Sequence, residues 1–406
     1  MASGNLNILV IGAGMYVCGK GTSGFGTVFP AICEWSKLHG IPEHLYLAAT
    51  SNDSVETANE KLGALNQLLG TDVRFRAFPE KGQADDPGCY HLALKEIPRP
   101  ACAILVVPDH LHYQIAMDCL RSGVHVLVVK PLTASVPEAR RLIETQQETG
   151  LYGAVEFHKR FDRANLKLKE AVASGAIGRP LYFVVEYSQR KRVPSEIFRN
   201  WVHDTNIFQY LGVHYVDIIY FVTGARPRRV MAKGQDGWLK QNGIDAYDAV
   251  HGVIEWEDPA GETFLSFILT NWIDPDKTTA MSDQQIKLVG TRGRIESNQK
   301  NRGLQLVTDE YGVEDINPDF CQTYPTASGG TGYRGYGIDS IHTFLSDVNE
   351  VETGNVSPAE LEHERPTFQN ALISTMVVEA VNRSLKKNGA WIDINPISLE
   401  KEEPIS

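Results

Sequence analysis

The chain has 406 residues, of which 42% are hydrophobic and 22% are charged, a composition typical of a soluble globular protein with two or three domains. Its net charge of -11 argues against nucleic acid or an anionic membrane as the main partner. The six cysteines show no CxxC pair and no Cys/His metal spacing, and no apolar run has the length of a signal-peptide core or a membrane span, so we expect a cytoplasmic protein without a bound metal.

The first predicted element is a buried strand over residues 7–11 that runs into Gly12-Ala13-Gly14, a pattern typical of a dinucleotide-binding turn. In such a turn the first glycine makes the tight bend and the second lets a pyrophosphate approach the backbone. The third position of the motif holds Val17, and four further glycines delay the next helix. Residues 17–26 then form either a mobile surface loop or a loop that folds over the phosphates or the substrate mouth. The predicted cofactor contacts in this turn are Gly12, Gly14, Met15 and Tyr16.

Strand-like runs alternate with helical segments up to residue 157, which predicts βαβ units and a doubly wound parallel sheet of the Rossmann type. Right-handed crossovers bring the carboxyl ends of such strands to one edge, where ligands bind. We therefore expect Gly12, Ser51, Pro108 and Lys130 along one edge. The further predicted strands of this sheet are 45–49, 73–78, 103–107, 124–129 and 152–157.

The end of the second strand usually selects the cofactor, because an acid there binds the ribose hydroxyl of NAD and a basic residue suits the phosphate of NADP. This chain has Ser51 and Asn52 at that place, and no arginine or lysine follows before Lys61. The sequence therefore favours NAD, with NADP as the alternative.

The strand over 124–129 is apolar on both faces and ends in Lys130-Pro131. Proline biases the residue before it toward extended geometry, so Lys130 is held at the carboxyl edge of a buried strand. A lysine there usually has an anionic, hydroxyl or carbonyl partner; the alternative is a side chain that simply reaches solvent. His112, after the fourth strand, is either a cofactor contact or a helix-terminal residue without chemistry.

The segment 206–224 reads as a helix with one apolar stripe, and Tyr210, His214 and Asp217 fall beside that stripe within a sector of about 60°. A phenol, an imidazole and a carboxylate in this arrangement predict a relay in which Asp217 orients His214, and His214 or Tyr210 moves a proton. The alternative is a core histidine bonded to a core tyrosine.

Beyond Gly224, successive strands without helices indicate a second, α+β domain with a large, open and mostly antiparallel sheet. One face of this sheet must be covered, which a second copy of the chain in a homodimer or homotetramer would do. We place the dinucleotide-binding domain at 1–158 and the substrate-binding and oligomerisation domain at 159–406, and we expect Gly329–Gly337 to be a loop. The predicted strands are 229–232, 249–254, 264–269, 285–289 and 304–307, and the predicted helices are 163–173, 340–348 and 369–386.

The glycine turn, Pro108-x-x-x-His112, Lys130-Pro131, the run Phe157 to Phe161 and Gly212-x-His214-x-x-Asp217 together resemble the Gfo/Idh/MocA oxidoreductases. The resemblance implies a nicotinamide cofactor and a sugar, cyclitol or sugar-nucleotide substrate. This chain departs from the family where Val129 replaces the glutamate of a Glu-Lys-Pro triplet, where Tyr210 replaces a frequent aspartate, and in the insertion at 17–26. The substrate-binding candidates are Lys130, His158, Lys159, Arg160, Trp201, Tyr210 and His214.

Our functional hypothesis is an NAD(P)-dependent sugar dehydrogenase or ketosugar reductase in which Lys130 polarises the reacting oxygen and His214 or Tyr210 is the acid/base. One alternative is a glycoside-cleaving or epimerising enzyme that oxidises a sugar transiently and restores its NAD in each turnover. Another is a cofactor-sensing regulator without catalysis.

Overall fold

The computed structural model describes residues 6–310, 312–327 and 329–394. The chain forms two compact units, and each combines segments that are distant in the sequence. Within the described residues, the first unit contains 6–132, 138–161 and 319–371, and the second contains 133–137, 162–318 and 372–394. The sequence-based division after residue 158 did not anticipate that residues 319–371 belong with the N-terminal segment.

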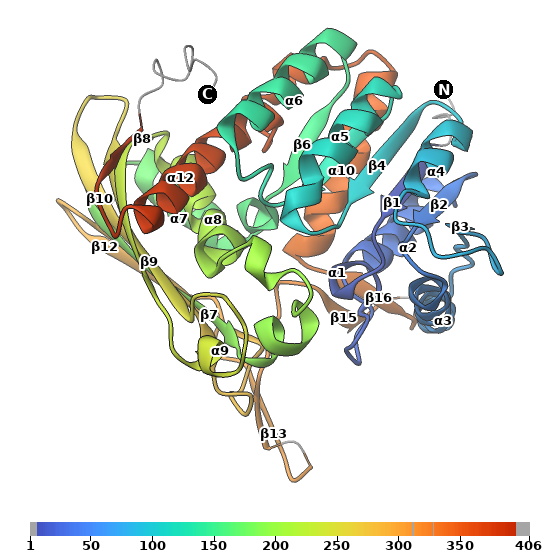
Figure 1. The fold of residues 1–406 in the computed structure, drawn as a ribbon, viewed down its shortest axis with the longest axis horizontal. Coiled ribbons are helices and arrows are strands. Elements are labelled where there is room, and N and C mark those ends of the chain that lie inside the picture. The colour runs from blue at the N-terminus through green and yellow to red at the C-terminus, as the bar shows by residue number, and fades with distance from the viewer. Residues whose placement is uncertain (1–5, 311, 328, 395–406) are drawn as a thin grey trace. The chain divides into compact units, whose positions relative to one another are not determined.

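The first unit is built on a six-stranded sheet in the order β3-β2-β1-β4-β5-β6, and all its pairs are parallel (Figure 1). This confirms the predicted Rossmann sheet. The fourth strand begins two residues earlier than predicted because Ala101 pairs with Asn7 of the first strand, and the third strand is shorter than predicted. The strands are β1 (Asn7–Ile11), β2 (Leu45–Ala48), β3 (Arg76–Phe78), β4 (Ala101–Leu105), β5 (His125–Val129) and β6 (Gly153–Glu156).

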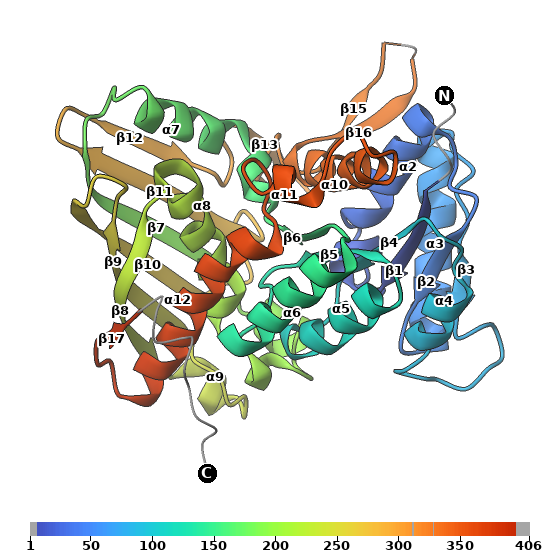
Figure 2. The same cartoon turned by 90° about the horizontal axis from the view of Figure 1, so that it is seen from above.

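Helices cover both faces of this sheet (Figure 2). On one face, α2 (Val28–His39), α3 (Asn52–Leu69) and α10 (Tyr336–Glu352) share one hydrophobic core with the strands. On the other face lie α4 (Tyr90–Glu96), α5 (His112–Arg121) and α6 (Val136–Thr149). Shorter helices in this unit are α1 (Met15–Cys18), η1 (Asp109–Leu111), η2 (His158–Phe161) and α11 (Pro358–Leu361).

Polar contacts attach residues 319–371 to the sheet of the first unit. The hydroxyl of Tyr152 donates to Asp347 of α10 at 3.2 Å, and Arg365 donates to the same carboxylate at 2.8 Å. At the start of β5, His125 Nε2 lies 2.7 Å from Glu352 Oε1. The late helix α10 is therefore part of the first unit.

The second unit contains a seven-stranded sheet in the order β12-β11-β7-β10-β9-β8-β17, in which only the β7–β10 pair is parallel. This confirms the predicted mostly antiparallel sheet. Its helices α7 (Arg163–Ala173), α8 (Val213–Thr223) and α12 (Phe368–Lys386) lie on one face (Figures 1 and 2), and α9 (Trp238–Gln241) is a single turn. The strands are β7 (Pro180–Arg190), β8 (Arg226–Gln235), β9 (Ala249–Glu257), β10 (Thr263–Asp274), β11 (Ser282–Gly290), β12 (Arg294–Asn298) and β17 (Ile392–Asp393).

Two expectations for the later chain were wrong. The predicted strand at 304–307 is not part of the large sheet as far as the chain is described, because β13 (Gln305–Thr308) pairs with β14 (Gly312–Asp315) in a separate hairpin. The expected loop at Gly329–Gly337 contains β16 (Thr331–Arg334), which pairs with β15 (Gln322–Pro325). Tertiary contact explains the second difference, because the backbone N–H of Tyr333 donates to Glu34 of α2 at 2.8 Å.

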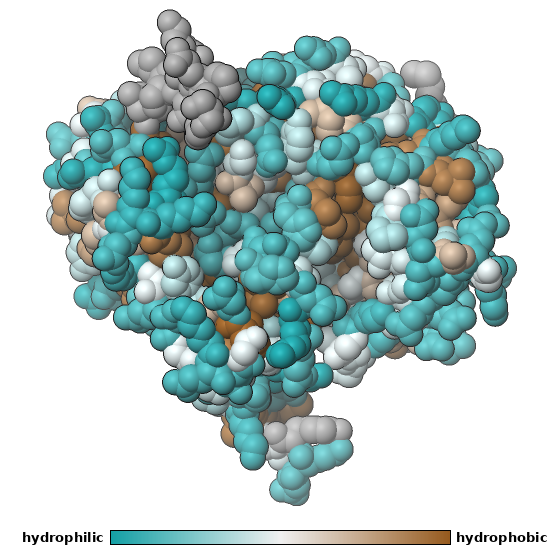
Figure 3. Space-filling view, viewed as in Figure 1, coloured by the Kyte–Doolittle hydropathy of each residue, from teal (hydrophilic) through white to brown (hydrophobic). Residues whose placement is uncertain are grey.

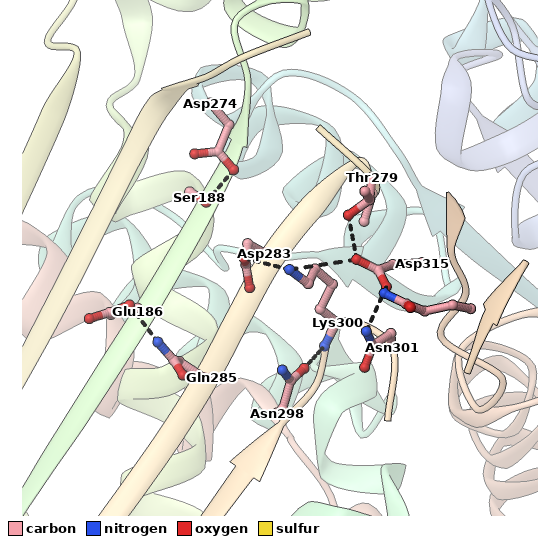
Figure 4. A network of polar contacts seen from close by, with 12 residues as sticks. Glu186, Ser188, Asp274, Thr279, Asp283, Gln285, Asn298, Lys300, Asn301 and Asp315 are labelled. Atoms are coloured by element: carbon pink, nitrogen blue, oxygen red, sulfur yellow. Dashed lines mark hydrogen bonds and ion pairs between the residues drawn. The ribbon is translucent and has the colours of Figure 1, made fainter. Parts of the chain in front are cut away.

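The hairpin strand β14 ends in a polar network centred on Asp315 (Figure 4). Its carboxylate accepts hydrogen bonds from Thr279 and from the amide of Asn301 at 2.6 Å, and Lys300 lies 3.6 Å away. The hydrogen bonds from Thr279 and Asn301 lower the pKa of Asp315 to about 2. The network therefore needs the ionised carboxylate.

Charged and polar residues occupy most of the face shown in Figure 3, in keeping with the 22% of charged residues in the chain. As far as the structure describes the chain, none of its helices has both the length and the apolar character needed to cross a bilayer.

Candidate active site

The predicted glycine turn connects β1 to α1. Gly12 has a φ of +109°, and a Cβ atom on it would lie 2.0 Å from the carbonyl oxygen of Val106, so only glycine fits. Gly14 precedes α1, and a Cβ built on it meets nothing within 4 Å. The first glycine thus makes the bend, while the backbone at the second is open to a close ligand, as a pyrophosphate requires. Met15 and Tyr16 form the first turn of α1.

The insertion at 17–26 is anchored to the neighbouring helix. Val17, at the third glycine position of the motif, is fully buried in the core. The ammonium of Lys61 in α3 donates to the carbonyl oxygens of Thr22 and Gly24, both at 2.8 Å. Lys20 donates to Asp53 at 2.8 Å at the start of the same helix. These contacts favour a folded loop over a mobile one; its predicted position over the phosphates stays a prediction.

The end of β2 receives a carboxylate from elsewhere in the chain. Ser51 caps α3 by accepting from the N–H of Ser54 at 3.3 Å. The backbone N–H of Asn52 donates to Asp85 Oδ1 at 2.9 Å, and its side-chain amide donates to the same oxygen at 3.2 Å. Asp85 therefore brings an acid to the place where the sequence shows none. No local signal identifies it, because it lies 33 residues further along the chain.

Lys130 lies at the carboxyl end of β5 and is only 7% exposed. Burial is the largest influence on its amine and lowers the pKa to about 8, while the carboxylates of Asp109 and Glu156 act in the opposite direction. Glu156 is close because it is the register partner of Val129 on the neighbouring strand β6. The reading of Lys130 as a side chain that reaches solvent is therefore wrong. The amine is buried, and the negative charges of Asp109 and Glu156 favour its cationic form.

His112 connects the two loops at this edge. Its Nδ1 lies 2.7 Å from the carbonyl oxygen of Pro131, and its Nε2 lies 3.0 Å from that of Val107. Burial lowers the pKa of His112, which is 1% exposed. The ring thereby ties the residue after Lys130 to the loop after β4, in which Pro108 precedes the short helix η1.

The run after β6 is almost entirely buried. His158 Nδ1 lies 2.8 Å from Glu156 Oε2, and the hydroxyl of Tyr16 lies 3.4 Å from the same nitrogen. The imidazole also packs against the rings of Phe320 and Tyr336, with centroids 5.3 and 5.6 Å away. Lys159 and Arg160 follow in η2 with exposed fractions of 1% and 6%.

Tyr210, His214 and Asp217 do not share one regular α-helix. Tyr210 lies in η5 (Phe208–Gly212), a π-helical turn, whereas His214 and Asp217 are buried in α8. The sector calculated at 3.6 residues per turn therefore does not hold between Tyr210 and His214, because a π turn contains more residues. π turns of this kind frequently mark functional sites. The predicted relay stays a prediction.

An aromatic cluster surrounds Tyr210 in the second unit. Its ring centroid lies 4.9 Å from that of Phe198, 6.3 Å from that of Trp201 and 6.0 Å from that of Trp272. The ring of His214 lies 6.3 Å from that of Tyr187, whose pKa is raised by burial. Two of the predicted substrate residues, Trp201 and Tyr210, therefore share one aromatic group, whereas the ring contact of His214 is with Tyr187.

Comparison with known proteins agrees with this architecture. A family described as "Oxidoreductase family, NAD-binding Rossmann fold" matches residues 50–157, and the "GFO/IDH/MocA C-terminal domain" matches residues 165–296. The myo-inositol 2-dehydrogenase of Thermotoga maritima is 25% identical over 266 residues, which cover 65% of this chain and 74% of that protein. The levoglucosan dehydrogenase of Pseudarthrobacter phenanthrenivorans is 24% identical over 325 residues, covering 72% and 80%.

Among solved structures, scyllo-inositol dehydrogenase from Lactobacillus casei with bound NAD(H) and scyllo-inositol has the same fold. The TM-score is 0.67 at 15% identity, over 96% of this chain and 99% of that one. The two family matches together extend from residue 50 to residue 296 and so fall on both units described above. The chain therefore belongs to the Gfo/Idh/MocA family of oxidoreductases, and its first unit is an NAD-binding Rossmann domain.

Proposed function

We propose that this protein is an NAD-dependent dehydrogenase or reductase that acts on a secondary hydroxyl or keto group of a sugar or cyclitol. The observation that carries the proposal is Lys130, a buried amine at the ligand-binding edge of the sheet whose pKa burial lowers to about 8. A perturbed amine in this position is typical of a functional site. The relatives named as inositol and levoglucosan dehydrogenases support the substrate class.

The chain's own residues would supply charge stabilisation and proton transfer. The Lys130 ammonium donates a hydrogen bond to the reacting oxygen and stabilises the negative charge that develops there. His214 or Tyr210 takes the hydroxyl proton during oxidation and returns it during reduction. Bound NAD supplies the hydride acceptor. The aromatic surfaces of Trp201 and Tyr210 suit the apolar face of a ring-shaped polyol.

The glycine turn and the end of β2 both suit NAD as the cofactor. Gly12 and Gly14 leave the backbone open for a pyrophosphate, and Asp85 places an acid at the end of β2. An acid there favours the ribose hydroxyl of NAD over the phosphate of NADP. The proposed contacts of His158, Lys159 and Arg160 with substrate rest on their position directly after β6.

A direct assay tests the proposal. Purified protein is mixed with NAD and a panel containing myo-inositol, scyllo-inositol and levoglucosan, and NADH formation is followed by absorbance. We expect NADH to form with at least one compound, and Lys130→Ala to reduce turnover by about 100-fold or more while NAD still binds. A matched control is Glu352→Gln, at the opposite end of β5, which should keep full turnover.

The same assay separates the competing functions. Product formation without NADH accumulation would indicate an enzyme that restores its NAD in each turnover. Tight NAD binding without turnover of any compound would indicate a regulator. Near-normal turnover of Lys130→Ala would contradict the assigned role of Lys130.

A further inference from the structure

A single buried acid distinguishes β6 from the other strands of the parallel sheet. The strand reads Gly-Ala-Val-Glu and is buried at every position, with Glu156 only 1% exposed. Strands covered on both faces are normally apolar throughout, and an ionised carboxylate in such a place is strongly destabilising unless it is paired. Its presence therefore needs an explanation outside the stability of the sheet.

The two carboxylate oxygens of Glu156 have different surroundings. Its Oε2 lies 2.8 Å from His158 Nδ1, and Tyr16 stands next to both groups. Its Oε1 is buried and has no hydrogen-bond partner among the residues that the structure describes. One oxygen thus orients the carboxylate, and the other is buried without a hydrogen-bond partner among the described residues.

The strand register brings Glu156 next to the end of β5. Val129 pairs with Glu156, so the acid lies one strand away from the residue that precedes Lys130. The resemblance noted in the sequence analysis implies a glutamate at the position of Val129. In this chain a glutamate is instead the register partner of that position on β6.

We propose that Glu156 is a positioning residue for Lys130: its carboxylate, oriented by His158, adds from the neighbouring strand to the negative charge of Asp109 and so helps to keep the buried amine in its cationic form. This inference rests on the proposed role of Lys130 in catalysis. It adds a residue that the motifs quoted in the sequence analysis do not contain.

The other groups at this edge do not replace Glu156. Asp109, from η1, exerts the larger attraction on the Lys130 amine and Glu156 the smaller, and His112, from α5, is engaged by two backbone carbonyls. Around Glu156, burial raises the pKa of Tyr16, and burial raises that of Cys321 to about 12, so both are neutral near physiological pH. Removal of Glu156 would therefore leave one acid facing the amine where there are now two.

The test measures the titration of Lys130 directly. Isotope-labelled lysine side chains are followed by NMR as a function of pH in the full-length protein, and the Lys130 signal is assigned with the Lys130→Arg variant. In Glu156→Gln the titration midpoint should move to lower pH by about one unit, because an attractive charge has been removed. Glu156→Asp, which keeps the charge, and Glu352→Gln, at the far end of β5, should stay close to the wild type.

Activity and cofactor binding supply the second measurement. In Glu156→Gln the alkaline limb of the turnover profile should move to lower pH together with the Lys130 midpoint, while NAD affinity and circular dichroism stay unchanged. If Glu156→Gln does not fold, His158→Asn removes the group that orients Oε2 and should move the midpoint in the same direction.

An unchanged Lys130 midpoint in a folded Glu156→Gln or His158→Asn variant would overturn the inference, even if the enzyme oxidises sugars. A shifted midpoint in a protein without dehydrogenase activity would support the inference about Glu156 and remove the proposed function. The proposed function and the inference about Glu156 can therefore be refuted independently of each other.

Discussion

Replacing Lys130 by methionine should make the protein more stable and inactive. The amine is 7% exposed, and its pKa falls from its ordinary value of 10.5 to about 8 because burial disfavours the charge. That difference corresponds to about 3 kcal/mol of cost for holding the cation in the folded state at neutral pH. The attraction of Asp109 and Glu156 is already contained in the net value. Methionine fills a similar volume without a charge.

The pH dependence follows from the same numbers. The folded-state pKa lies below the unfolded value, so the full cost is present below pH 8, diminishes as pH rises, and vanishes above 10.5. Wild-type stability should therefore gain from Lys130 deprotonation across this window, and Lys130→Met should lack that gain. Turnover should fall in Lys130→Met at every pH.

Urea unfolding followed by tryptophan fluorescence measures the effect, with activity assayed in parallel. The expected result at pH 7 is an unfolding free energy that is higher by up to about 3 kcal/mol in Lys130→Met. Lys81→Met, at an exposed lysine of the same unit, should change it little. A Lys130→Met protein less stable than the wild type would refute the reasoning, since it would show that the loss of the positive charge near Asp109 and Glu156 costs more than the burial of the amine.

Three further results are expected. Gly12→Ala should abolish NAD binding and destabilise the protein, because its Cβ would overlap the Val106 carbonyl. The control Gly63→Ala, in open space on α3, should instead stabilise the protein by about 0.5–1 kcal/mol. Thermal melting and NAD titration compare the two variants. Asp85→Asn should raise NADP affinity relative to NAD in fluorescence titrations, and an unchanged ratio would exclude this acid from cofactor selection. Asp315→Asn should lower the melting temperature at pH 7. The difference in melting temperature between this variant and the wild type should disappear as pH falls from about 4 toward 2. The reason is that the folded-state pKa of Asp315 is depressed to about 2, so the stability that the ionised carboxylate contributes is lost over that range.

The parallel sheet could be predicted because its signals are local. Apolar runs such as 124–129 and the bend at Gly12 each specify their structure within a few residues, and βαβ units permit few topologies. The place of Lys130 at the sheet edge followed from the same reasoning. Its buried, acid-paired state did not, because Asp109 and Glu156 come from other parts of the chain.

The features missed by sequence reasoning depend on contacts between distant residues. Asp85 reaches the end of β2 from a loop that carries no motif, and Glu156 meets Val129 only through strand register. The π turn at Tyr210 was missed because the periodicity calculation assumes a regular helix over the whole segment. Residues 329–337 were expected to be a loop from their glycines, while β16 forms there by pairing with β15.

The packing of residues 319–371 in the first unit affects the design of truncated forms of this protein. Ile341 and Phe344 of α10 are packed in the same apolar interior as Phe29 and Ile32 of α2. A recombinant fragment that stops near residue 158 would lack α10 and leave that interior uncovered to water. We expect such a fragment to accumulate in inclusion bodies, whereas a fusion that joins residues 319–371 to it through a short linker should yield a dispersed product.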